Sequence, residues 1–192
     1  MPDPAELYRE LLRDLASRAR PVRIVKKSGV WHQRAAAKVL YWLTLGGQRT
    51  YLTHYVTTLG HTIYVPDDWD DWTPGDAWRL LRHELVHVAQ FERYGWFVMA
   101  IVYGLLPLPA GLAYGRARLE WEAYAETLRA SAALGGPAAA RDPALHARIV
   151  SRFTGPDYGW MWPFPRQVQR WIDAEVARID AGGSAGAGRS PR

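Results

Sequence analysis

The sequence predicts an α+β fold in which a small antiparallel sheet or hairpin packs on one long helix beside a second long helix. Three observations lead to this prediction. Residues 49–66 are rich in Thr, Tyr and Val around a Leu59-Gly60 turn, which is typical of a β-hairpin. Residues 73–94 carry strong signals for the start and end of a helix. A further helical pattern covers 115–134 and ends at two glycines.

The remaining elements follow from local patterns. Apolar residues at helical spacing predict an amphipathic N-terminal helix, and the chain ends in a Gly- and Ser-rich stretch. The other expected elements are a strand over 21–27, a helix within 31–45, a polar loop over 67–72, a short helix over 143–152, an aromatic loop over 154–165 and a last helix over 165–181.

The helix over 73–94 has the clearest boundaries. Thr73 is placed as the N-cap, Pro74 takes the first helical position, and Asp76 stands three residues after the cap. Gly95 supplies the residue that can end the helix with a positive φ.

Composition limits the class of protein. With 192 residues, 48% of them hydrophobic and 22% charged, the chain suits one domain over 1–181 and a flexible tail over 182–192. The absence of cysteine excludes disulfides and thiolate metal sites, and it fits a cytoplasmic protein. The net charge of +5 comes from scattered arginines rather than a basic stripe, so no nucleic-acid partner is expected.

Residues 96–114 form an apolar stretch without charge. Pro107 and Pro109 interrupt it, and a bilayer cannot satisfy the carbonyls that they would free. Two short buried segments around a turn are therefore the preferred interpretation. A membrane-surface contact through 96–114 is the alternative.

The pattern that carries chemistry is His83-Glu84-Leu85-Val86-His87, in the middle of the predicted helix. A spacing of four places both imidazoles on one face, one turn apart, where they can bind one ion. Glu84 is rotated by about 100° from His83 and can reach a water on that ion without being a ligand. This spacing is a zinc-peptidase signature. The alternative is a pair of core histidines.

Here the sequence resembles the gluzincin metallopeptidases, which pair HExxH with a glutamate on a later helix. The match is Glu122-Ala123 with Glu126 a turn later. The resemblance implies that Glu122 is the third zinc ligand and that Glu126 orients a histidine. It also implies that residues 61–66 form the edge strand that pairs with an extended peptide. The Val88-Ala89-Gln90 that follows the motif is similar to small bacterial zincin-like domains of unassigned function.

Two alternatives concern the second helix and the transition state. Glu120 is the other candidate ligand, but its neighbours on the helical wheel are polar and indicate a solvent-facing position. The alternative for Glu122 is a surface salt bridge with Arg118 or Arg129. Candidates for stabilising the transition state are Tyr124, His146 and, foremost, Tyr158 in a Gly-flanked loop.

The sequence thus predicts a zinc metallopeptidase. Zn²⁺ is held by His83, His87 and Glu122, and Glu84 activates a metal-bound water against a bond of a peptide or protein substrate. The alternative is a catalytically silent binding module of the same fold, or a membrane-surface module.

Overall fold

The computed structural model describes residues 1–27, 56–104, 113–155 and 161–187. The chain groups into two compact units, which are described separately. The first is Pro4–Glu92, and the second is Arg93–Arg192 with Met1–Asp3. Compact units of this kind also occur within single domains, so the expected single domain over 1–181 stays a prediction.

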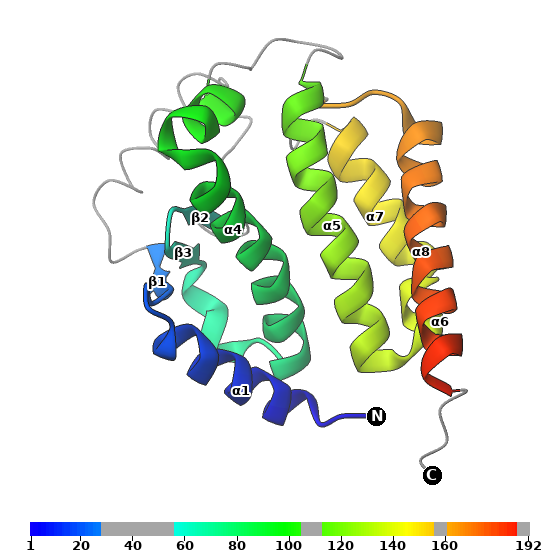
Figure 1. Cartoon of the computed structure of the whole chain (residues 1–192), viewed down its shortest axis with the longest axis horizontal. Coiled ribbons are helices and arrows are strands. Elements are labelled where there is room, and N and C mark those ends of the chain that lie inside the picture. The colour runs from blue at the N-terminus through cyan, green and yellow to red at the C-terminus, as the bar shows by residue number, and fades with distance from the viewer. Residues whose placement is uncertain (28–55, 105–112, 156–160, 188–192) are drawn as a thin grey trace. The chain divides into compact units, whose positions relative to one another are not determined.

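The first unit holds a three-stranded mixed sheet with strand order β1-β3-β2 (Figure 1). Its elements in chain order are α1 (Pro4–Ser17), β1 (Arg23–Lys26), β2 (Thr57–Leu59), β3 (Thr62–Val65), the 3-10 helix η2 (Asp67–Asp71) and the larger part of α4 (Pro74–Gly104). Strands β2 and β3 form the predicted antiparallel hairpin, and Gly60 has the positive φ of 59° that its turn needs. Strand β1 pairs with β3 in parallel, so the sheet is mixed rather than antiparallel.

The prediction that residues 61–66 form an edge strand is wrong. Among the described residues, β3 lies in the centre of the sheet, with β1 on one side and β2 on the other. Its burial agrees with this position, because Ile63 and Val65 are almost completely inaccessible to solvent. Strand β2 is an edge strand of the sheet as far as the described residues go.

Helix α4 starts as predicted. The Thr73 hydroxyl accepts a hydrogen bond from the Asp76 backbone N–H at 3.2 Å, so the cap is formed. Gly95 has φ 75° and ψ 166°, a conformation that interrupts the helix where an end was expected. The chain then turns directly into a further helical segment that continues to Gly104.

One apolar core joins the sheet to α4 and α1 in the first unit. Ile63 and Val65 of β3 belong to the same cluster as Leu81 and Val88 of α4 and Leu15 of α1. The sheet is therefore packed on the helix that bears the two histidines, as the sequence predicted. This packing fixes the rotation of α4 about its axis and hence the direction of its other faces.

The second unit is helical. It contains the end of α4, then α5 (Tyr114–Gly135), the short α6 (Pro137–Ala140), α7 (Pro143–Thr154) and α8 (Pro165–Ala187). Figure 1 shows α5, α7 and α8 side by side. The three helices share one apolar core, which contains Trp121 of α5, Ile149 of α7 and Ile172 of α8. Helix α8 extends beyond the predicted end at residue 181.

The apolar segment that follows Gly95 differs from its prediction. Trp96 and Phe97 are exposed, whereas a buried segment was expected, and only Met99 of this turn is buried. In the part of the chain that the structure describes, no helix is both long and apolar enough to cross a bilayer. The predicted helix within 31–45, the first part of the hairpin and residues 105–112 lie outside the described residues.

Candidate metal centre

Helix α4 presents both histidines of the motif on one face. The imidazole rings of His83 and His87 have centroids 5.2 Å apart, as expected for residues one turn apart. Both side chains are buried. Two adjacent buried imidazoles supply nitrogen donors of the kind that zinc prefers, away from competing bulk water.

His87 is oriented by its neighbour on the same helix. Its Nδ1 lies 2.9 Å from Oε1 of Gln90, and Gln90 is itself buried. An amide oxygen accepts hydrogen bonds, so this contact is satisfied by the tautomer of His87 that carries its proton on Nδ1 and keeps a lone pair on Nε2. A histidine that donates one ring N–H in this way presents the other nitrogen as a metal ligand.

Glu84 is buried, and a residue of the sheet forms a hydrogen bond with its carboxylate. The Thr58 hydroxyl of β2 donates a hydrogen bond of 2.6 Å to Oε2 of Glu84. Lys27, which is 0% exposed, follows β1 and interacts electrostatically with the same carboxylate. Burial lowers the pKa of Lys27 to about 8, and the attraction of Glu84 opposes that shift.

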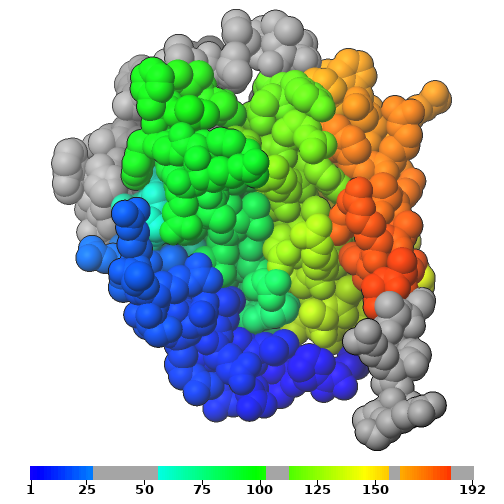
Figure 2. All heavy atoms as spheres, viewed as in Figure 1, coloured from blue at the N-terminus to red at the C-terminus, as the bar shows by residue number. Residues whose placement is uncertain are grey.

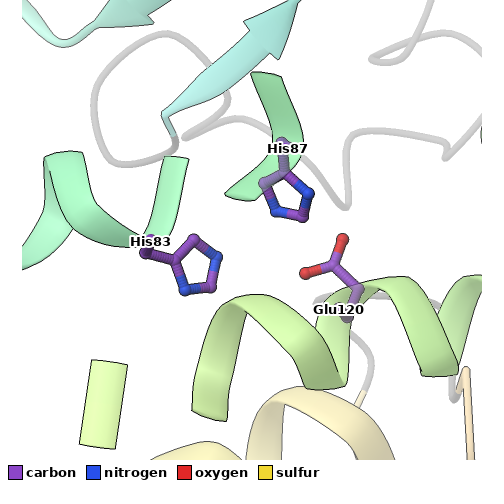
Figure 3. Close-up of side chains that lie close together, drawn as sticks. All are labelled: His83, His87 and Glu120. Carbon is purple, nitrogen blue, oxygen red and sulfur yellow. The ribbon is translucent and has the colours of Figure 1, made fainter. Parts of the chain in front are cut away.

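Glu120 of α5 is the carboxylate that joins the two histidines. One ligand atom from each of His83, His87 and Glu120 lies within 4.8 Å of the others, and all three residues are buried. Figure 3 shows the Glu120 carboxylate turned toward both rings. Two imidazoles and one carboxylate are a donor set of zinc sites with an open fourth position, so these residues fit a zinc ion.

The structure favours Glu120 over Glu122, which the sequence had preferred. Glu120 was expected to face solvent, but it is only 3% exposed, and Ser131 on the same sector is 1% exposed. Glu122 is half-buried and does not belong to the group of three. The physical reason is that α5 buries two stripes of residues, one of which contains small and polar side chains.

Glu126 contacts an arginine. Its Oε2 lies 3.3 Å from Nη1 of Arg129, and Nε of the same arginine lies 2.7 Å from Glu175 on α8. Arg178 binds the other oxygen of Glu175 at 2.6 Å. These groups form an ionic cluster within the second unit, and the orientation of a histidine by Glu126 stays a prediction.

Of the three candidate stabilisers of the transition state, Tyr158 lies outside the described residues. The ring of Tyr124 packs against Phe153, with centroids 5.6 Å apart. His146 lies on α7, and its Nε2 is 2.7 Å from the Ala140 carbonyl oxygen. The contacts of Tyr124 and His146 place them in the second unit's packing.

Sequence reasoning missed Thr58 and Lys27. Thr58 stands on the predicted hairpin, where a threonine is an ordinary strand residue, so its type carried no signal. Lys27 offered a weak one, because it is one of very few lysines in an arginine-rich chain and follows a short apolar strand.

Comparison of the chain with protein-family models, with curated proteins and with solved structures gives no match.

Proposed function

We propose that this protein is a zinc-dependent hydrolase that cleaves peptide bonds. The observation that carries the proposal is the buried group of His83, His87 and Glu120, with Glu84 adjacent to the first ligand. A helix that carries two ligands one turn apart, with a carboxylate between them, matches the arrangement that water activation needs.

Each residue of the site has a distinct task. His83, His87 and Glu120 hold the ion, which when bound lowers the pKa of a water and polarises the substrate carbonyl. Glu84 accepts the proton of the attacking water and passes it to the leaving amine. Since Glu84 is not one of the grouped ligands, its carboxylate stays available for proton transfer.

Two contacts support these roles. The hydrogen bond from Thr58 fixes one oxygen of Glu84 and so orients the carboxylate that we propose as the proton acceptor. The contact with Gln90 fixes the tautomer of His87. Orientation of this kind favours catalysis, because a reacting group held in place loses less entropy in the transition state.

A general base also separates this proposal from a silent binding module. A structural zinc site is closed by four protein ligands and needs no buried carboxylate beside them. Here the described residues bring three donors together, and Glu84 is kept in the core at the cost of its desolvation. Both features favour a catalytic site.

The test is zinc content, measured by mass spectrometry on protein purified without chelator. We expect one zinc per chain in the wild type and its loss in Glu120→Ala. Glu122→Ala is the matched control, because it removes the same group from the same helix two residues away, and it should keep its zinc.

The reverse result, with zinc lost in Glu122→Ala and kept in Glu120→Ala, would assign the third ligand to Glu122. A wild type that takes up no zinc even when zinc is added contradicts the proposal. Circular dichroism of each variant shows that a loss of zinc is not a loss of fold.

A further inference from the structure

We propose that a helical face after the Gly95 kink inserts into the surface of an anionic lipid bilayer. This apolar face consists of Trp96, Phe97, Val98 and Ile101, all in the second unit. The proposal is independent of the metal site, because none of these residues belongs to it.

The first observation is the exposure of large apolar side chains. Trp96 is 61% exposed, Phe97 79%, Val98 42% and Ile101 37%. Figure 2 shows this stretch, in bright green, at the surface of the molecule. Met99 is 1% exposed and anchors the opposite side of the turn. A helix that buries one side and exposes tryptophan and phenylalanine on the other is amphipathic in the sense required for interfacial binding.

The second observation is the distribution of charge around the face. No charged residue occurs between Tyr94 and Gly115 in the sequence. In the sequence, the exposed Arg93 stands immediately before this stretch, and the exposed Arg118 follows it on α5, where its guanidinium lies 5.8 Å from the centroid of the Trp171 ring. Apolar residues enter the acyl boundary, while flanking arginines remain among anionic headgroups, which is the charge order that a bilayer surface selects.

The third observation is a second exposed aromatic group in the same unit. Tyr114 and Phe164 are both half exposed, and Trp162 joins them with ring centroids 5.1 Å and 5.0 Å away. Tyr114 begins α5, and Phe164 immediately precedes α8, so they share the end of this unit at which both helices start (Figure 1). Aromatic rings with a polar atom concentrate at the level of lipid headgroups.

These observations favour a lipid surface over a protein partner. Apart from Met1, every large hydrophobic side chain that is exposed in the described part of the chain belongs to the apolar face or to this aromatic group. A protein interface of standard size has a polar rim that supplies hydrogen bonds and salt bridges. The four side chains of the apolar face carry no charge, and the charged residues next to it in the sequence, Glu92 and Arg93, stand at one end only, so the face suits acyl chains better than a rimmed protein interface.

The test is flotation of the full-length protein with lipid vesicles. We expect binding to phosphatidylcholine vesicles that contain phosphatidylglycerol, and binding about tenfold weaker to vesicles of phosphatidylcholine alone. The double variant Trp96→Ser/Phe97→Ser should bind the anionic vesicles at least about tenfold more weakly, because it removes the two most exposed apolar side chains. Ala100→Ser is the matched control, since Ala100 is exposed on the same turn and its substitution removes little apolar area.

The proposal would be overturned if the wild type failed to float with anionic vesicles, or if the double variant floated as well as the wild type. It would also be overturned if sedimentation showed that the wild type is a dimer and the double variant a monomer, since the face would then contact a second copy of the chain. His87→Ala should bind vesicles like the wild type, so failure of the zinc proposal leaves this test intact.

Discussion

Two buried glutamates, one in each unit, are held in contrasting ways. Glu175 of the second unit accepts hydrogen bonds from two arginines, Arg129 and Arg178, whose side chains are 50% and 69% exposed. Glu84 of the first unit accepts its hydrogen bond from the hydroxyl of Thr58. Its cationic neighbour Lys27 is fully buried.

The difference agrees with our proposal that Glu84 takes part in the chemistry, whereas Glu175 supports the fold. Glu175 is locked between two cations that reach it from the surface, so its charge is compensated on both oxygens. Glu84 lies beside His83, a candidate metal ligand, and the Thr58 hydroxyl donates to its Oε2. The proposed role of Glu84 as a general base fits the second environment, because both oxygens of Glu175 are engaged by arginines.

The first prediction tests the proposed role of Glu84 as a general base. Glu84→Gln should lower the hydrolysis of a denatured protein by about 10²–10⁴-fold, because general-base catalysis contributes about that much. Zinc content should stay at the wild-type level, because Glu84 is not among the grouped ligands. The rate is followed by the release of new amino termini.

Glu175→Gln is the matched control for that experiment, since it makes the same change in a buried glutamate of the other unit. It should keep the wild-type rate per folded molecule and lose only stability, because a neutral amide cannot replace the charge between two arginines. Equal loss of activity in both variants would show that Glu84→Gln lowers activity by destabilising the fold and not by removing a general base.

The second prediction concerns the buried cation beside Glu84. The pKa of Lys27 is lowered to about 8 in the folded protein, below its ordinary value of 10.5. The folded state therefore releases this proton first as the pH rises. Between about pH 8 and pH 10.5 the wild type should gain stability relative to Lys27→Met, on the order of 3 kcal/mol in total. Chemical denaturation at a series of pH values measures the difference.

Lys26 is the control, because it is the adjacent residue with the opposite shift. Its hydrogen bond to Asp70, 2.7 Å long, raises its pKa. Its contribution is complete below pH 10.5 and is lost only above it, so Lys26→Met should show no gain of the wild type within the same window. A difference between wild type and Lys27→Met that stays constant from pH 8 to pH 10.5 contradicts the assignment.

Local signals in the sequence predicted much of the first unit. The Thr73 cap, the Leu59-Gly60 turn and the spacing of His83 and His87 each depend on residues a few positions apart, and the structure contains all three. The order of the strands could not be predicted from such local signals. Strand β1 reaches β3 across more than thirty residues of sequence, and pairing at that distance has no local signature.

The third candidate ligand, Glu120, shows why the site could be predicted only in part. Glu120 and Glu122 are two positions apart, about 200° around a helix, so the choice depends on which side of α5 is buried. Trp121 and Leu128 mark one buried stripe clearly. The stripe with Glu120 and Ser131 is equally buried but polar, and helical-wheel reasoning assigns such a stripe to solvent.

The last prediction concerns the hydrogen bond between Thr58 and Glu84. Thr58→Val removes the hydroxyl that donates to Glu84 and keeps the shape of the side chain. We expect a loss of about 1–3 kcal/mol in the free energy of unfolding, because hydrogen bonds to charged groups contribute more than neutral ones. Thr154→Val is the matched control in the second unit, since its hydroxyl donates to a neutral acceptor, the carbonyl of Val150, at 2.9 Å. Its loss should be the smaller one, at about 0.5–1.5 kcal/mol. Urea denaturation of both variants measures the difference, and equal losses would mean that the Glu84 carboxylate draws no charge-assisted stabilisation from Thr58.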